Sequence, residues 1–178
     1  MLLFIYLLPL LFVTLCCFAV CLIWAVLNYK YVTVKKNGRG TNIWLIFNLI
    51  CFCVMCFLII YNTLIVRSGN IYKVELIPFY SFVVAKTQRE MIRQLYMNVI
   101  MFLPFGMFLS CALSHKFKAG VTVFVSSVAG ALLSLIIELS QYFFHLGEAW
   151  TDDVICNALG AFLGALVIVV PKLFKKKK

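Results

Sequence analysis

Residues 134–164 read SLIIELSQYFFHLGEAWTDDVICNALGAFLG. Two apolar segments, each long enough for a helix, flank a short acidic turn, and both carry polar residues at helical spacing. The first segment holds Glu138, an acid inside a long apolar run. A carboxylate near the centre of a membrane costs about 2.5 to 3.5 kcal/mol on insertion scales. We therefore expect Glu138 to be either neutral or matched by a cation and hydrogen bonds.

The chain as a whole is too apolar for a water-soluble domain. Its 178 residues are 65% hydrophobic and only 12% charged, whereas a soluble domain is nearer half apolar. The composition predicts an all-α integral membrane protein in which residues 1–178 form a single membrane domain. The net charge of +10 lies in the loops and the tail. In a membrane protein, such charge sets the orientation of the chain in the bilayer and attracts anionic lipid, so we do not expect nucleic-acid binding.

Hydrophobic runs predict about five transmembrane helices. They are residues 2–28, 42–66, 95–114, 119–146 and 153–170. A shorter apolar patch after the second run cannot cross a bilayer, so we predict a re-entrant or interfacial segment near residues 76–90. Lys and Arg concentrate in the first loop, the third loop and the tail. The positive-inside rule then predicts an external amino terminus and a cytoplasmic carboxyl terminus.

Three predicted spans each carry a polar stripe. On a helix, Glu138, Gln141 and His145 share a face. In lipid, such stripes turn toward each other or toward a water-filled cavity. We predict a polar pocket that opens to the outer face and is closed toward the cytoplasm. Its predicted residues are Asn98, Glu138, Gln141, His145, Asp153, Asn157 and Arg93.

Each of these residues also has a plainer interpretation. Glu138, Gln141 and Asn157 can simply hold helices together. His145 fits an ordinary histidine at a helix end, and Asp153 fits a helix cap. Candidate cations for Glu138 are Arg93, Arg89 and His145.

Metal and cofactor sites are not expected. The eight cysteines fall inside predicted spans, where lipid disfavours the thiolate form that binds metal. Glu138, His145 and Asp153 match no recognised ligand spacing.

Prolines and glycines in the same segments predict structural roles. Pro104 lies inside the third span and predicts a kink, and the adjacent Gly106 permits close approach of another helix. Gly160 and Gly164 form a GxxxG pattern, which favours close helix packing. Pro78 belongs to a short LIPF element in the predicted interfacial segment.

Taken in order, these motifs resemble the VanZ-like family of bacterial membrane proteins. That family has a LIPF element followed by N-x3-F-x-P-x-G, E-x2-Q and D-x3-N-x2-G-x3-G. The matching residues are Leu76, Ile77, Pro78, Phe79, Asn98, Phe102, Pro104, Gly106, Glu138, Gln141, Asp153, Asn157, Gly160 and Gly164. The VanZ-like region is thus predicted at about residues 76–170, after two additional helices at 2–28 and 42–66. Residues 147–151 lack the Arg and extra Asp of many members.

The resemblance implies a multi-pass protein of the bacterial cytoplasmic membrane. A named member is associated with low-level resistance to the glycopeptide teicoplanin. The implied role is to alter or bind a cell-surface or lipid-linked component. Expected partners are therefore membrane lipid and a lipid-linked cell-wall precursor or glycopeptide, with the oligomeric state open.

Two other functions stay open. The first is a membrane enzyme that acts on a lipid-linked substrate, with Glu138 as acid or base and Asp153 as a second catalytic candidate. The sequence carries no recognised catalytic motif, which favours a non-enzymatic role. The second is a helical scaffold for an envelope partner.

Overall fold

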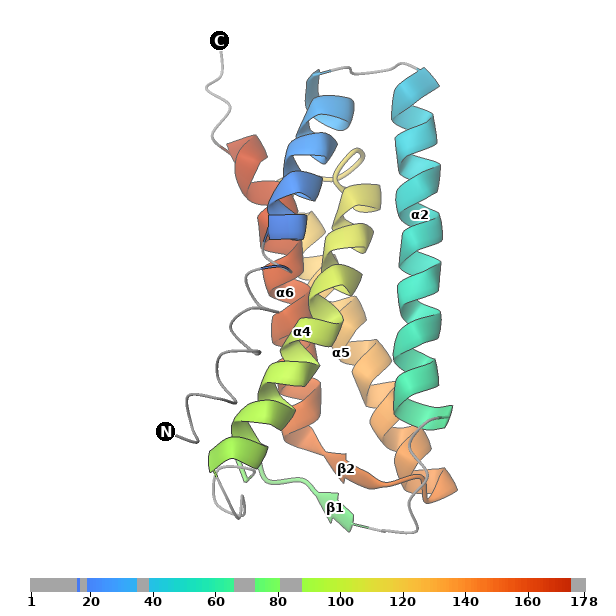
Figure 1. The fold of residues 1–178 in the computed structure, drawn as a ribbon, viewed down its shortest axis with the longest axis vertical. Helices are drawn as coiled ribbons and strands as arrows, with labels where there is room; N and C mark the ends of the chain where they lie inside the picture. The colour runs from blue at the N-terminus through green and yellow to red at the C-terminus, as the bar shows by residue number, and fades with distance from the viewer. Residues whose placement is uncertain (1–15, 17–18, 35–38, 66–72, 81–87, 174–178) are drawn as a thin grey trace.

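The computed structural model describes residues 16, 19–34, 39–65, 73–80 and 88–173 (Figure 1). Residues 19–28 are helical and continue into the π-helical segment η1. The elements that follow are η1 (Tyr29–Val34), α2 (Arg39–Ile60), η2 (Tyr61–Ile65), β1 (Lys73–Glu75), α4 (Gln88–Leu113), α5 (Ala119–Phe144), β2 (Glu148–Trp150) and α6 (Thr151–Leu173). Apart from two three-residue strands, the regular structure described is helical.

Four of the described helices are long and apolar enough to cross a membrane. They are Gly40–Ile65, Tyr96–Leu113, Ala119–Phe144 and Thr151–Pro171. The predicted all-α membrane architecture is confirmed. The first predicted span, residues 2–28, lies partly outside the described residues, and its described part belongs to a shorter apolar helix, Ala19–Tyr31. The direction of insertion stays a prediction.

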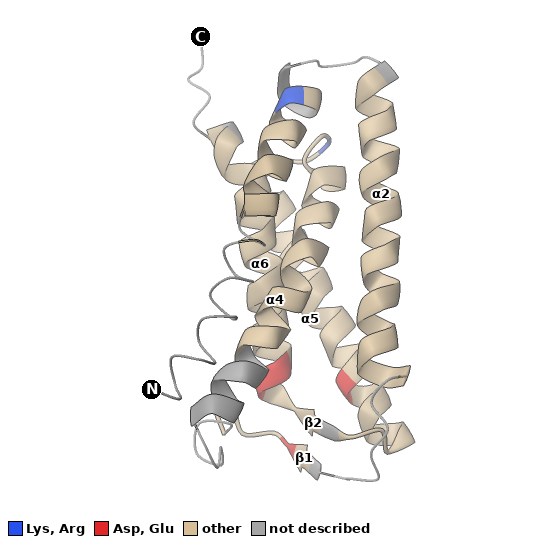
Figure 2. Cartoon of the chain, viewed as in Figure 1, with Lys and Arg blue, Asp and Glu red and all other residues tan. Residues whose placement is uncertain are grey.

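The long helices lie side by side, with α4 in contact with α2, α5 and α6 (Figure 1). α4 and α6 run in the same direction, and α2 and α5 run opposite to them. We call the end where α5 stops and α6 begins the acidic end, and the end where α4 stops and α5 begins the basic end. Figure 2 shows the described carboxylates toward the first end and the described lysines at the second. The described carboxylates therefore gather at the acidic end, where Lys73 of β1 and Arg89 and Arg93 of α4 also lie in the chain.

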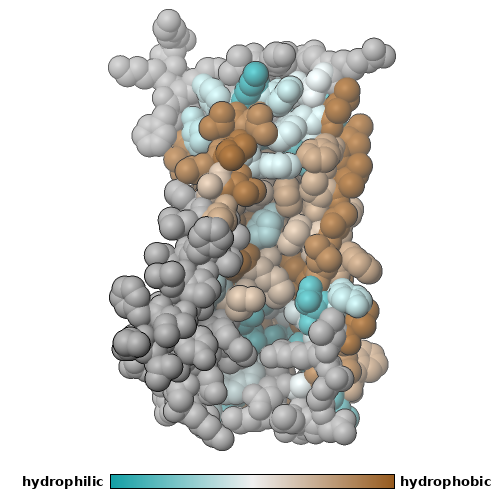
Figure 3. Space-filling model, viewed as in Figure 1, coloured by the Kyte–Doolittle hydropathy of each residue, from teal (hydrophilic) through white to brown (hydrophobic). Residues whose placement is uncertain are grey.

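The outer face of α2 is strongly apolar. Figure 3 shows hydrophobic side chains gathered along this helix. Its exposed side chains include Ile43, Ile46, Ile50, Val54 and Phe57. A contiguous apolar face of this size is rare on soluble monomers, so the surface fits lipid as its solvent.

Glycines bring α4 and α6 into direct backbone contact. A Cβ added at Gly106 of α4 would overlap backbone of Ala161. Added at Gly160 or Gly164 of α6, it would overlap a carbonyl oxygen of α4. Helices in lipid gain little from the hydrophobic effect when they meet, so small residues that allow close packing favour their association.

Two tryptophan–asparagine hydrogen bonds join residues 19–28 to α2. Trp24 Nε1 donates to Asn48 Oδ1 at 2.8 Å, and Trp44 Nε1 donates to Asn28 Oδ1 at 3.0 Å. Both asparagines are fully buried. Trp24 also packs edge-on against Phe108 of α4. The two crossed bonds fix the register of the helices, and the aromatic contact connects them to the rest of the bundle.

We expect Gly164→Val to destabilise the bundle by about 3 kcal/mol or more, because the new side chain overlaps backbone of α4. Thermal unfolding of the detergent-purified protein measures the effect. Gly120→Ala is the matched control, since a Cβ at Gly120 meets no atom within 4 Å, and it should unfold at or slightly above the wild-type temperature. Equal unfolding temperatures for Gly164→Val and wild type would contradict this packing.

Candidate functional site

A two-stranded parallel sheet crosses the acidic end of the bundle. β1 pairs with β2 in the register Lys73↔Glu148, Val74↔Ala149 and Glu75↔Trp150. Directly after β1, residues 77–80 form a turn in which the N–H of Tyr80 donates to the carbonyl oxygen of Ile77 at 3.2 Å. The described parts of the predicted interfacial segment near residues 76–90 are therefore a turn at 76–80 and the start of α4 at 88–90. Residues 81–87 lie outside the described residues.

Two further hydrogen bonds fasten this turn to the start of α6. Thr151 Oγ1 donates to the carbonyl oxygen of Glu75 at 3.2 Å. The backbone N–H of Phe79 donates to Asp152 Oδ1. Phe79 has a φ of 64°, a left-handed conformation that a bulky residue seldom adopts. The buried Asp152 carboxylate thus holds the LIPF element in a conformation that its sequence alone disfavours.

Glu138 is buried on α5, and its carboxylate reaches β2. Its side chain is 7% exposed, and Oε2 accepts a hydrogen bond from the backbone N–H of Trp150 at 2.8 Å. Such a bond satisfies a buried carboxyl oxygen that lipid cannot satisfy. Because Trp150 is the residue before α6, this bond ties the end of α5 to the start of α6.

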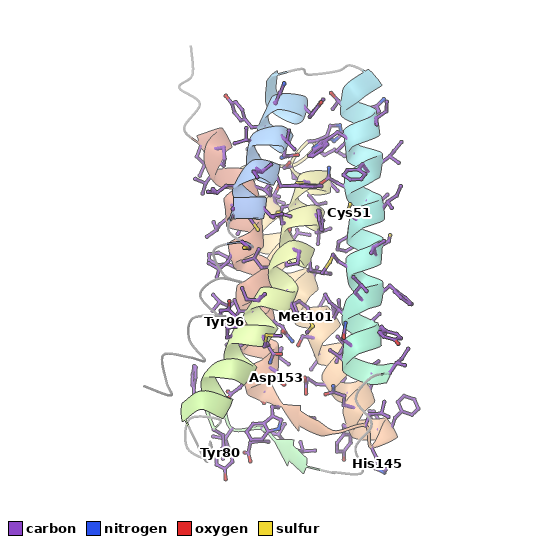
Figure 4. All side chains as sticks on the ribbon, viewed as in Figure 1. Cys51, Tyr80, Tyr96, Met101, His145 and Asp153 are labelled. Atoms are coloured by element: carbon purple, nitrogen blue, oxygen red, sulfur yellow. The ribbon has the colours of Figure 1, made fainter. Side chains whose placement is uncertain are left out.

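Of the cations suggested for Glu138, His145 has a described side chain, and the two arginines do not. His145 is exposed at the C-cap of α5, with a φ of 56°, and Figure 4 places it at the outer edge of the acidic end. Arg93 and Arg89 belong to the first part of α4, and their side chains lie outside the described part of the chain. The Trp150 backbone is a partner that the sequence did not reveal, because a side-chain pattern carries no signal for a backbone donor.

A groove of about 680 Å³ opens beside Glu138, between α5 and the β1–β2 pair. Most of its lining is apolar, and Glu75 and Glu138 contribute carboxylates. The apolar part of the lining includes Val74, Leu76, Leu135, Leu139, Tyr142 and Val154. Leu135, Leu139 and Leu76 are 45%, 47% and 77% exposed, so the groove is continuous with the lipid-facing surface. Its chemistry suits an apolar chain next to a group that donates hydrogen bonds.

The polar stripes meet inside the bundle rather than in this groove. Gln141 Nε2 donates to the carbonyl oxygen of Thr63 at 3.0 Å, which joins α5 to η2. Asn157 Nδ2 donates to Ser134 Oγ at 2.7 Å, which joins α6 to α5. Asn98 Nδ2, Gln141 Oε1 and Asn157 Oδ1 are buried without a hydrogen-bond partner among the described residues. Of these predicted pocket residues, Glu138 lines the groove, and the three amides do not.

The remaining predicted residues occupy varied positions. Asp153 is 4% exposed in the first turn of α6 (Figure 4), where the helix dipole favours an acid. Pro104 lies inside α4, which continues through it, and Pro78 is exposed in the turn after β1. A group of three His, Cys, Asp or Glu side chains that could hold a metal is absent from the described residues.

Comparisons with known proteins match the predicted family. A family model described as VanZ/LLP1 matches residues 12–174. Among curated proteins, the chain is similar to Protein VanZ of Enterococcus faecium, with 35% identity over 105 residues. That alignment covers 58% of this chain and 57% of the relative, so it spans little more than half of the relative's length. No solved structure matches the chain.

We expect Glu138→Leu to speed amide hydrogen exchange at Trp150 about tenfold, because it removes the acceptor of the Trp150 N–H. Glu138→Gln keeps a side-chain oxygen at this position and should exchange close to the wild-type rate. Mass spectrometry of peptides that cover residues 145–152 measures both. Unchanged exchange in Glu138→Leu would show that the bond does not protect this amide.

Asp152 offers a parallel test of the LIPF turn. Asp152→Leu should release the Phe79 amide and raise its exchange rate about tenfold, since the carboxylate accepts that N–H. Asp152→Asn retains an acceptor oxygen and serves as the matched control. If the Phe79 amide exchanges at the same rate in Asp152→Leu and Asp152→Asn, other contacts hold the turn.

Proposed function

The chain belongs to the VanZ/LLP1 family, and on that premise we propose that it binds a lipid-linked component of the bacterial cell surface in the groove beside Glu138. By occupying that component, the protein reduces the action of glycopeptides such as teicoplanin. The role proposed is binding, with no bond made or broken by the protein. Its location would be the bacterial cytoplasmic membrane, which the helices cross several times.

The observation that supports this most directly is a buried carboxylate beside an apolar groove. Exposed leucines of α5, Leu135 and Leu139, continue the lipid-facing surface into the groove. Carboxylates at Glu75 and Glu138 border the same space. An apolar wall suits a lipid chain, and carboxylates suit the hydroxyl or amine donors of a sugar or peptide head group. The groove therefore has both features that a lipid-linked saccharide or peptide would need.

The lysines at the basic end support an outward-facing groove. Lys30, Lys116 and Lys118 are exposed in segments at the basic end. Short basic loops stay on the cytoplasmic side during insertion. The acidic end, where the groove lies, would then face outward, where glycopeptides act.

Teicoplanin susceptibility tests the proposal in a susceptible host that expresses the protein. The wild type should raise the inhibitory concentration above that of an empty vector. We expect Glu138→Gln to lose this increase, because removing a charged acceptor weakens binding of a donor group about tenfold. The substitution keeps an oxygen for the Trp150 N–H, so the local fold should survive. Membrane levels of each variant are measured in parallel.

Ser140→Ala is the control on the same helix. Its hydroxyl donates to the carbonyl oxygen of Ile136 at 2.7 Å and does not line the groove, so full protection should remain. If Glu138→Gln protects as well as the wild type while Glu138→Leu fails, Glu138 acts only by holding Trp150, and the proposed binding role is wrong. Equal susceptibility with wild type and empty vector would contradict a contribution to resistance.

A further inference from the structure

A second groove, of about 530 Å³, lies between α5 and α6 at the basic end. Its walls are apolar, with Val123 and Phe124 on α5 facing Phe162 and Leu166 on α6. It is separate from the groove beside Glu138, with which it shares no lining residue. The family motifs and the proposed function make no use of it.

The dimensions of this groove suit one acyl chain. Along α6 its lining runs from Phe162 to Leu173, a distance of about 16 Å at 1.5 Å per residue. The hydrocarbon core of a bilayer is about 30 Å thick, so the groove spans about one leaflet. It starts where α5 begins and α6 ends, which is the depth at which a lipid head group meets the protein.

The mouth of the groove is positively charged. Lys116 and Lys118 are exposed in the loop directly before Ala119, the first lining residue of α5. Lys118 occupies the N-cap of α5 without a side-chain capping hydrogen bond. The amides of the first turn of α5 therefore add to the positive potential of the two lysines. The described carboxylates lie toward the acidic end (Figure 2), so they offset little of this charge.

We propose that this groove binds one anionic phospholipid from the leaflet at the basic end. Its acyl chain lies between α5 and α6, and its phosphate lies at Lys116 and Lys118. Charge complementarity selects the anionic head group, and the length of the apolar groove selects a lipid chain over a soluble anion. This site does not depend on Glu138 or on glycopeptide resistance.

Gly120 offers a position from which the groove can be blocked. It lines the groove, and a Cβ added there meets no atom within 4 Å. Gly120→Trp therefore projects a large side chain into the space proposed for the acyl chain, and Gly120→Ala is its small-side-chain control. Lys116→Gln with Lys118→Gln removes the charge at the mouth. Lys30→Gln removes one lysine elsewhere at the same end, and Lys116→Arg with Lys118→Arg keeps the charge.

Native mass spectrometry of the full chain in detergent tests the site, with phosphatidylglycerol or phosphatidylcholine added. We expect one tightly held phosphatidylglycerol and weaker retention of phosphatidylcholine. Each lysine near a lipid surface strengthens binding of an anionic lipid about fivefold. The double Lys→Gln variant, which loses two lysines, should therefore bind phosphatidylglycerol about thirtyfold more weakly. Gly120→Trp should lose the bound lipid, and Gly120→Ala, Lys30→Gln and the double Arg variant should retain it.

Several results would overturn the proposal. Equal retention of the two lipids would remove the charge selectivity, and an equal loss in Lys30→Gln would show general attraction to the basic end. Lipid binding that survives Gly120→Trp, in a protein with the wild-type unfolding temperature, would place the lipid elsewhere. A dimer that Gly120→Trp dissociates, without any lipid preference, would assign the groove to a second copy of the chain.

Discussion

Direct backbone contact between α4 and α6 positions the acidic end of this protein. The two helices approach so closely because Gly106, Gly160 and Gly164 leave no side chain between them. In lipid, where helices gain little from the hydrophobic effect on meeting, such packing is a main source of association. It fixes where α6 starts relative to the bundle. The start of α6 in turn carries the Asp152 carboxylate that holds Phe79.

Most polar side chains inside the bundle determine which helices pack together, because they form hydrogen bonds between helices. Asn157 joins α6 to α5 by a hydrogen bond to Ser134. Toward the basic end, the hydroxyl oxygens of Ser110 on α4 and Ser126 on α5 are 2.8 Å apart and share a hydrogen bond. Lipid offers no alternative partner, so each pair favours one arrangement of helices over others. Glu138 differs because its carboxylate both holds a backbone amide and borders a groove. Glu138 therefore contributes both to the local structure and to the proposed binding.

Much of the fold followed from the sequence, because hydropathy reports spans and helical spacing reports which polar residues share a face. The β1–β2 pair did not, since its strands are three residues each and lie far apart in the chain. The Trp150 amide beside Glu138 was also missed, because backbone donors leave no mark in a sequence. A signal for the Trp–Asn pairs was present: Asn48 is a polar residue within a predicted span, one helical turn after Trp44.

The pairing of β1 with β2 also has a consequence for biosynthesis. β1 and Glu75 are made well before β2 and Thr151, the partners that fasten them. Synthesis proceeds from the amino terminus. α5 is therefore made before Trp150, whose backbone N–H donates a hydrogen bond to Glu138. The acidic end can assemble only as the last hairpin, α5 with α6, is completed, which makes the final third of the chain decisive for maturation.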